Sequence, residues 1–199
     1  MLVKRIFDII CSLFGLLVLS PVFFVIILLI KFGSPGPIFF RQIRVGLYEK
    51  PFKIHKFRTM IVNAEAQGLK ITVGADHRVT RIGRFLRKTK LDELPQLIDV
   101  FVGKMSLVGP RPEVPVYVEY YPPEVKAVVF KVRPGITDWA SIQMIDENEI
   151  LGKADNPEQA YIEKVLPEKL DYAVKYVKTR TMGMDIYLIG LTILKIFIR

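Results

Sequence analysis

The hydrophobic pattern begins with a long apolar stretch close to residue 1. From Ile9 to Ile30, 22 consecutive residues carry no charge, and most of them are Leu, Ile, Val or Phe. A straight helix of that length spans about 33 Å, which is enough to cross a bilayer core of about 30 Å. Ser20-Pro21 lies in the middle, and a proline there removes a backbone donor and kinks or breaks the helix. The pattern therefore predicts a membrane helix that is broken at Ser20-Pro21.

The basic residues around this stretch leave two arrangements open. Lys4 and Arg5 precede it, and Lys31, Arg41 and Arg44 follow it. Basic flanks stay on the cytoplasmic side of a membrane, so both ends favour the same side. A re-entrant hairpin fits these flanks, whereas a spanning helix with an internal proline fits the length equally well. A cleaved signal peptide fits less well, because no small-x-small cleavage site follows the apolar run.

Shorter patterns follow and predict an α+β domain that is mainly helical. They predict two short strands within residues 39–60, joined by a turn at 46–50, and short helices over 62–70, 81–88 and 94–101. Asn156-Pro157 predicts the start of a helix that continues to about residue 181, with an interruption at Pro167. Gly183 then separates it from an apolar stretch, Ile186–Ile198. That stretch is too short to span a membrane comfortably and is typical of an interfacial or core helix.

Composition adds that the chain is both basic and hydrophobic. It has 199 residues, a net charge of +9 and 51% hydrophobic residues, a combination that favours anionic membranes over nucleic acid as the partner. A single cysteine, Cys11, excludes an internal disulfide framework and a cysteine zinc cluster. Only two histidines, His55 and His77, argue against a histidine-rich metal site.

The positive charge is concentrated in one segment. Residues 41–90 contain 13 Lys or Arg residues and only three acidic residues, so this segment carries +10 and the remainder −1. A solvated surface would explain such a segment without any ligand. Its position next to a membrane stretch favours phosphate instead, in a lipid headgroup, a substrate or both.

Asp92-Glu93 follows directly after the basic segment. Pro95 favours a helix start here, so both carboxylates are expected at or near a helix N-terminus. They could simply be acids that are stabilised by the helix dipole. The functional interpretation is a carboxylate nucleophile or base beside a ligand for a hard metal. Oxygen ligands together with substrate phosphates suit magnesium.

Several cations are candidates for binding phosphate. Arg87 precedes the two acids, and Arg111 lies between prolines in a stiff loop. Lys56 and Arg58 share one face of a predicted strand, with His55 on the opposite face and not expected to be catalytic. The usual phosphate loops, GxGxxG and GxxxxGK[ST], and the nucleophile elbow GxSxG are absent from the sequence.

Taken in order, the motifs resemble those of the bacterial sugar transferase family, the small monotopic polyprenyl-phosphate phosphoglycosyl transferases. The segments that carry the resemblance are the apolar run with Ser20-Pro21, KFRTM (56–60), LDELPQ (91–96), GPRP (109–112) and RPGIT (133–137). They extend over nearly the whole chain. Asp138 departs from the pattern, because many members have glycine there, and the shape of that loop stays open.

The resemblance implies a phosphotransferase. It would move a phosphosugar from a UDP-sugar to a polyprenyl phosphate such as undecaprenyl phosphate, release UMP and form a polyprenyl-diphosphate sugar. This is the first membrane step in the synthesis of a polysaccharide or another glycoconjugate. Asp92 would be the nucleophile that carries a covalent phosphosugar intermediate, and Glu93 would bind Mg²⁺. Because the nucleophile and the diphosphate are both anionic, cations must offset their repulsion. The cations expected to do so are Arg87, Arg111, Lys56, Arg58 and Arg133.

The resemblance also implies a location and a domain organisation. The protein would enter the bacterial inner membrane from one side, with its catalytic domain on the cytoplasmic face. Residues 1–37 would form a re-entrant helix hairpin broken at Ser20-Pro21. Residues 38–182 would form a compact catalytic domain with short strands and interfacial amphipathic helices, followed by a C-terminal interfacial or packing helix at 183–199. The expected partners are a UDP-sugar, polyprenyl phosphate and the phospholipid membrane. Nucleic acid is not expected, and a homodimer is left open.

Two other functions fit parts of the same pattern. A membrane enzyme with the same substrates but no covalent step would use the two acids only as metal ligands. A basic module without enzymatic activity would be anchored by residues 9–30 and would bind anionic lipid or nucleic acid through residues 41–90, with a steep dependence on salt. The two acids beside the basic segment favour an enzyme over that module. The sequence does not identify the sugar.

Overall fold

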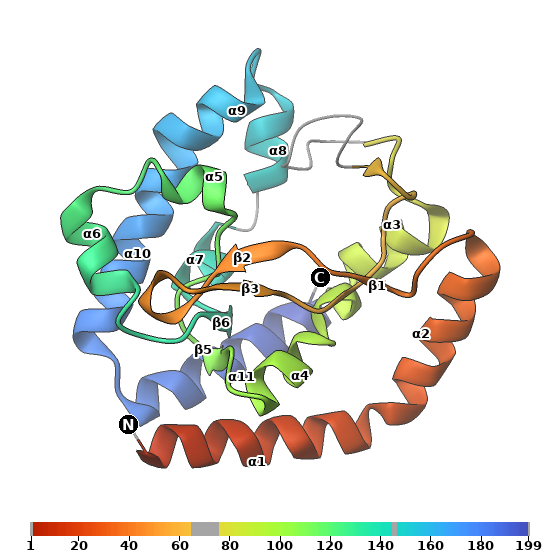
Figure 1. Ribbon diagram of the computed structural model, residues 1–199, viewed down its shortest axis with the longest axis horizontal. Coiled ribbons are helices and arrows are strands. Elements are labelled where there is room, and N and C mark those ends of the chain that lie inside the picture. Colours follow the sequence, from red (N-terminus) through yellow and green to blue (C-terminus); the bar gives the residue numbers. More distant parts are fainter. Residues whose placement is uncertain (1, 65–75, 145–146, 199) are drawn as a thin grey trace.

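The computed structural model describes residues 2–64, 76–144 and 147–198. Helices dominate the described chain (Figure 1). The helices are α1 (Leu2–Val18), α2 (Ser20–Gly33), α3 (Arg81–Lys88), α4 (Gln96–Phe101), α5 (Pro115–Val118), α6 (Pro123–Val129), α7 (Trp139–Gln143), α8 (Glu147–Gly152), α9 (Pro157–Ala160), α10 (Leu166–Thr179) and α11 (Met182–Ile198). The strands are β1 (Phe39–Phe40), β2 (Ile43–Val45), β3 (Pro51–Lys53), β4 (Lys56–Phe57), β5 (Ser106–Val108) and β6 (Gly135–Thr137). The mainly helical α+β prediction is confirmed.

Helices α1 and α2 meet at Leu19 and are bent relative to each other by 60°. Pro21 lies in the first turn of α2, where its missing N–H removes no helix hydrogen bond. The Ser20 hydroxyl donates to the Leu17 carbonyl at 2.8 Å and satisfies an acceptor at the end of α1. The predicted break is confirmed. Of the described helices, none is by itself long and apolar enough to cross a membrane, whereas the bent pair together reaches that length and composition.

Helix α1 has the reverse of the usual polarity. The residues that it buries against the domain are Asp8 and Ser12, and Asp8 accepts a hydrogen bond from the Leu107 backbone at 3.1 Å. Large apolar side chains are exposed on α1, among them Ile6, Ile10, Leu13, Phe14 and Leu17. Figure 1 shows α1 along the lower edge of the molecule, with the domain on one side of it. A contiguous apolar face of this kind marks a surface that meets lipid or protein.

Both ends of the bent pair are tied to the domain. Lys4 forms an ion pair with Asp185 of α11, and Arg5 donates to two carbonyls near the end of α4, at 2.6 and 2.8 Å. Beyond α2, Arg58 donates to the Ser34 carbonyl at 2.8 Å and to the Ser34 hydroxyl at 2.9 Å. The basic residues near the apolar stretch therefore have specific partners in addition to their general preference for one side of a membrane.

The strands form three separate pairs. Strands β2 and β3 form the hairpin predicted around the turn at 46–50, and β1 pairs antiparallel with β4 outside it. The region predicted as two strands therefore contains four short ones. Strands β5 and β6 pair in parallel, which the sequence patterns did not predict because each has only three residues. Strand β6 begins at Gly135, inside the RPGIT motif.

The helix predictions hold with two changes. Helix α3 occupies residues 81–88 as predicted, and α4 begins at Gln96, after a 3₁₀ turn η3 (Leu91–Glu93). The C-terminal helix does not break at Pro167, because a π-helical turn η4 (Tyr161–Val165) joins α9 to α10. Helix α11 begins at Met182, so Gly183 lies inside it and does not separate two helices. Residues 65–70 of the helix predicted over 62–70 lie outside the described residues.

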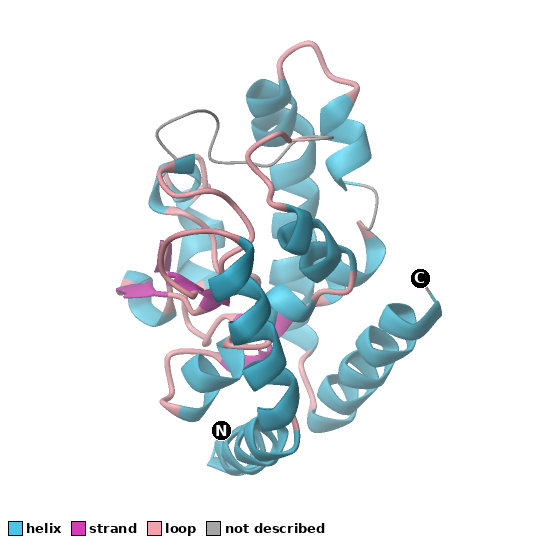
Figure 2. Cartoon of the chain, turned by 90° about the vertical axis from the view of Figure 1, so that its right-hand side faces the viewer, coloured by secondary structure: helices cyan, strands magenta, loops and turns pink. Residues whose placement is uncertain are grey.

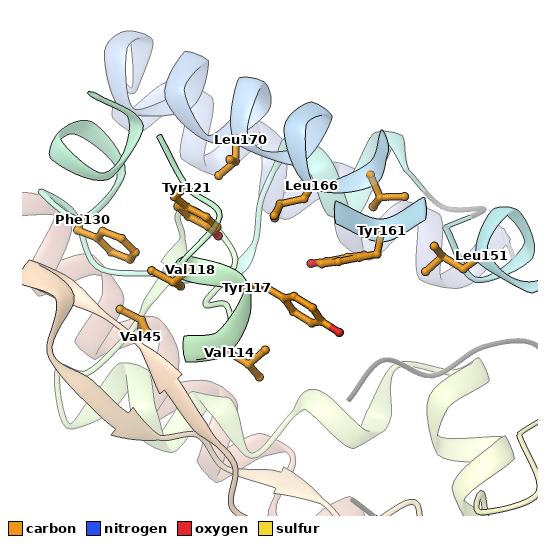
Figure 3. Close-up of a cluster of buried hydrophobic side chains, with 11 residues drawn as sticks. Val45, Val114, Tyr117, Val118, Tyr121, Phe130, Leu151, Tyr161, Leu166 and Leu170 are labelled. Atoms are coloured by element: carbon orange, nitrogen blue, oxygen red, sulfur yellow. The ribbon is translucent and has the colours of Figure 1, made fainter. Parts of the chain in front are cut away.

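The strands are short beside the helices (Figure 2), and a cluster of buried side chains joins α5, η4 and α10 (Figure 3). In this cluster the rings of Tyr117 and Tyr161 lie 4.8 Å apart between centroids, below Leu166 in Figure 3. The Tyr161 hydroxyl donates to Glu113, which follows the GPRP motif (residues 109–112). The core of this part of the domain therefore also positions the loop that carries Arg111.

Candidate active site

Asp92 and Glu93 lie in the η3 turn between α3 and α4. Lys90 has a left-handed conformation (φ 59°, ψ 13°), which ends α3 and turns the chain into η3. Leu91 packs against a buried cluster that contains Phe57 and Leu86, so the turn is fixed to the domain. Helix α4 has no side-chain hydrogen bond at its N-cap. The two acids are thus close to the helix N-terminus as predicted, without acting as hydrogen-bonding caps.

The Glu93 carboxylate is held by two cations. Lys56 Nζ lies 2.9 Å from Glu93 Oε1, Arg111 Nη1 lies 3.1 Å from Oε2, and Arg111 Nη2 also donates to Oε1. Burial by itself would raise the pKa of Glu93, but the charges and hydrogen bonds of Arg111 and Lys56 hold that pKa well below its usual range. Glu93 is therefore ionised, and the cations that pair with it come from β4 and from the loop after β5.

Asp92 has a different environment although it is the next residue. It is only 8% exposed, and its Oδ1 is buried without a hydrogen-bond partner among the described residues. Burial and then the Glu93 charge raise the pKa of Asp92, whereas Lys56, Lys90 and Arg87 oppose that rise. One carboxylate is neutralised by ion pairs, and its neighbour keeps an oxygen that can react or bind. Adjacent carboxylates with opposite pKa shifts are a common feature of catalytic sites.

Arg111 is positioned by a rigid loop. Its backbone N–H donates to Asp138 Oδ2 at 3.2 Å, and Asp138 Oδ1 accepts from Ser141 N at 2.8 Å to cap α7. A Cβ on Gly135 would lie 2.1 Å from Gly109 N, so the loop packs directly against the start of β6. The departure from glycine at position 138 therefore has a structural role here, because this aspartate joins the loop to α7.

The other predicted cations divide into two groups. Lys56 comes from β4, and Arg87 of α3 lies close enough to Asp92 to act on its charge while its Nε donates to Thr59 Oγ1 at 2.8 Å. Arg58 instead binds the segment after α2. Arg133 donates to the Gly103 carbonyl at 2.8 Å, at the opposite end of α4 from the acids. The described contacts thus bring Lys56, Arg87 and Arg111 together with the acids, and give Arg58 and Arg133 structural partners.

A second buried pair next to the site was not expected. Asp99 of α4 is fully buried and accepts from the His55 backbone at 2.7 Å, while its other oxygen lies 2.8 Å from His55 Nδ1. This contact fixes the residue before Lys56 against α4. A signal existed in the sequence, because Asp99 is the single charged residue in the helix that follows Asp92-Glu93.

The residues present fit magnesium. No group of three or more His, Cys, Asp or Glu side chains that could hold a metal occurs in residues 2–64, 76–144 and 147–198. Magnesium does not require such a group, since it is usually bound by one or two carboxylates together with water and substrate phosphates. The unpartnered oxygen of Asp92 and the ionised Glu93 beside it supply hard oxygen donors of this kind.

Comparison with known proteins agrees with this chemistry. A family model described as bacterial sugar transferase matches residues 1–199. The chain is 39% identical over 199 residues to UDP-glucose:undecaprenyl-phosphate glucose-1-phosphate transferase of Escherichia coli, which covers 99% of this chain and 40% of that protein. It is 35% identical over 193 residues to UDP-N-acetylgalactosamine-undecaprenyl-phosphate N-acetylgalactosaminephosphotransferase of Aeromonas hydrophila, and the match covers 96% of this chain and 43% of that protein. The uncharacterized sugar transferase EpsL of Bacillus subtilis is 34% identical over 198 residues, and the match covers 100% of this chain and 89% of that protein. The chain thus spans about two fifths of the first two relatives and most of the third.

Proposed function

The chain belongs to the bacterial sugar transferase family, and from that premise we propose that it transfers a phosphosugar from a UDP-sugar to a polyprenyl phosphate such as undecaprenyl phosphate. The observation that carries this proposal is the pair of neighbouring acids in η3. Asp92 keeps a buried oxygen that has no hydrogen-bond partner in the described part of the chain, while Glu93 beside it is neutralised by Lys56 and Arg111. A reactive carboxylate within a group of cations suits attack on an anionic diphosphate.

The reaction proceeds in two displacements. A carboxylate oxygen of Asp92 attacks the phosphorus on the sugar side of the diphosphate, and the bond to the leaving phosphate breaks, so that UMP departs with the electron pair. An oxygen of the polyprenyl phosphate then attacks the same phosphorus and releases the Asp92 carboxylate. Splitting the transfer in this way lets a soluble donor and a membrane-bound acceptor use one site in turn.

The cations of the site have separate tasks. Lys56 and Arg111 keep Glu93 ionised and place positive charge where the diphosphate must approach. Arg87, from α3, adds charge on the Asp92 side. Glu93 would hold Mg²⁺, which would supply positive charge for the phosphate oxygens. Because phosphoryl transfer depends mainly on positioning and neutralisation of charge, these residues account for the chemistry without a further acid or base.

We also propose a membrane location, which the N-terminal helices support. The outward face of α1 is apolar, and both ends of the bent α1–α2 pair are bound to the same domain, through Lys4, Arg5 and Ser34. A pair anchored in this way would enter and leave the bilayer on one side, and these contacts support a re-entrant hairpin. The basic segment supports a catalytic domain on the cytoplasmic face of the bacterial inner membrane.

The central test measures UMP release and the covalent adduct. The full-length protein in detergent or nanodiscs is incubated with UDP-glucose and UDP-N-acetylgalactosamine, the two sugars named for the relatives above, together with polyprenyl phosphate. Asp92→Asn should lower turnover by about 10³-fold or more. The exposed Asp171→Asn on α10 is the matched control and should keep full activity. With labelled UDP-sugar and no lipid, label should remain on the wild-type protein and not on Asp92→Asn.

Two results would contradict parts of this proposal. Full turnover of Asp92→Asn would exclude Asp92 as the nucleophile. Turnover without any trapped adduct, with kinetics that require both substrates together, would favour a single displacement in which the acids only bind metal. For the hairpin, Leu2→Cys and Phe32→Cys in a Cys11→Ser background should both react with an impermeant thiol reagent from the cytoplasmic side. Reaction from opposite sides would show a spanning helix.

A further inference from the structure

Gln96 is the residue of the LDELPQ motif whose polar side chain has neither a hydrogen-bond partner among the described residues nor a role in the proposed reaction. Its side chain is 1% exposed, and its Nε2 is buried without a hydrogen-bond partner among the described residues. A buried amide donor without a partner destabilises the fold, because the group has lost water and gained nothing in return. A polar residue that weakens the fold at a catalytic turn points to a ligand.

The helix places this amide one turn from Asp92. Leu94 (φ −53°, ψ −36°) and Pro95 (φ −60°, ψ −14°) have helical backbone angles, so the winding continues from η3 into α4. The backbone N–H groups of Leu94, Leu97 and Ile98 each donate to the carbonyl three residues earlier, so the chain here turns about once every three residues. Gln96 therefore lies about one turn after Asp92 and shares its side of the winding with Asp99, three residues further on. Asp99 binds His55, so this side faces the segment that leads into β4.

The polar residues before and after Gln96 in this stretch have partners. Beyond it along α4, Asp99 is occupied by His55, and before it Glu93 is occupied by Lys56, the next residue of the same segment. Between Asp92 and Asp99, the buried side-chain atoms without a hydrogen-bond partner among the described residues are an acceptor, Asp92 Oδ1, and a donor, Gln96 Nε2. They do not pair with each other, although a hydrogen bond between residues four apart is a common arrangement in helices.

A phosphoryl group complements both atoms at once. Its phosphorus is the electrophile for a carboxylate oxygen, and its anionic oxygens accept hydrogen bonds from a neutral amide. We propose that Gln96 is a substrate-contacting residue, whose Nε2 donates to an oxygen of the phosphoryl group while that group is transferred to and from Asp92. This inference rests on the proposed phosphosugar transfer and deepens it. A neutral donor stabilises developing charge on the phosphoryl oxygens without forming an ion pair that would occupy the Asp92 carboxylate.

The test compares catalysis and stability in the same variants. Gln96→Met has a similar volume and removes the unpaired amide, so its unfolding midpoint should equal or exceed that of the wild type. Its kcat for UMP release should fall by about 10²–10³-fold, with the KM for the UDP-sugar within about threefold, because the contact is made mainly in the transition state. Gln96→Glu replaces the donor with an anion and should lose at least as much activity. Gln143→Met, at an exposed position on α7, is the control and should match the wild type in both measurements.

The outcomes separate this inference from the proposed function. Loss of kcat with an unchanged or higher unfolding midpoint supports contact with the phosphoryl group. Wild-type kcat in Gln96→Met or in Gln96→Glu would overturn it, and so would a parallel fall of activity and midpoint, which would show a structural role. If the wild type itself released no UMP from any UDP-sugar, the proposed function would fail. If the wild type and Gln96→Met were equally active, only the role of Gln96 would fail.

Discussion

Replacing Lys4 with methionine removes the cation that neutralises Asp185 and keeps the length of the side chain. Asp185 is 3% exposed at its side chain, and its other described partner is the Tyr176 hydroxyl at 2.7 Å. Removing one partner of a buried ion pair costs about 3–5 kcal/mol, because the remaining charge stays buried and uncompensated. Lys4 is 29% exposed, so water can partly replace it, and we expect the lower end, about 3 kcal/mol. Against a total stability of about 5–15 kcal/mol, that loss is large.

Trp139 provides the assay, since it is the single tryptophan of the chain. Its ring centroid lies 6.2 Å from that of Tyr187 on α11, the helix that carries Asp185. Tryptophan fluorescence during denaturation in detergent therefore follows the docking of α11. Lys178→Met, at an exposed position on α10, is the matched control and should stay within about 0.5 kcal/mol of the wild type.

The double variant Lys4→Met/Asp185→Leu tests the physical reason. Replacing both members of a buried ion pair with apolar residues is often neutral, so this variant should lie within about 1 kcal/mol of the wild type and above Lys4→Met alone. Equal free energies of unfolding for Lys4→Met and Lys178→Met would show that the ion pair does not stabilise the docking of α1 and α11. A double variant as unstable as Lys4→Met would show that an uncompensated charge is not the cause.

Three further expectations follow from the site and its packing. Lys56 opposes the rise in the pKa of Asp92, which must be ionised to attack, so Lys56→Met should move the acid limb of the kcat/KM profile to higher pH. The control Lys88→Met, at an exposed position, should leave that limb in place. An unmoved acid limb for Lys56→Met would contradict this electrostatic account. Gly83→Ala would place a Cβ 2.0 Å from a backbone oxygen and should destabilise the protein by about 1–3 kcal/mol. Gly190→Ala would meet no atom within 4 Å and should stabilise it by about 1 kcal/mol. A higher unfolding midpoint for Gly83→Ala than for Gly190→Ala would show that close packing at Gly83 does not limit stability. Removal of divalent cations with EDTA should stop UMP release, and added Mg²⁺ should restore it. Unchanged UMP release in EDTA would show that the reaction does not need a divalent cation.

Local patterns in the sequence predicted the elements that depend on neighbouring residues. The break at Ser20-Pro21, the helix at 81–88 and the hairpin around 46–50 follow from proline, apolar spacing and turn residues. The two acids at a helix start were also predicted correctly. The sequence did not predict the β5–β6 pair, because two strands of three residues have no periodicity that could reveal them.

The roles of charged residues depended on contacts between distant segments. Lys56 and Arg58 are two residues apart and were expected to act together, yet one binds Glu93 and the other binds the segment after α2. Arg111 meets Glu93 because the loop after β5 folds back over η3. His55 was set aside as not catalytic, and its pairing with Asp99 depends on packing across 44 residues of chain. No local pattern specifies which of many cations will meet a given carboxylate.

The sequence by itself determined that this protein has a broken apolar helix, a strongly basic segment and two acids at a helix start, because these features arise from composition and from short-range spacing. Only the tertiary structure decided that the two acids differ. Glu93 is ion-paired by residues from two other segments. Asp92 is buried, and neither its Oδ1 nor the Gln96 amide nitrogen has a hydrogen-bond partner within the residues that the structure describes. The physical reason is that desolvation and charge pairing depend on what the folded chain brings within a few ångströms, regardless of separation in the sequence.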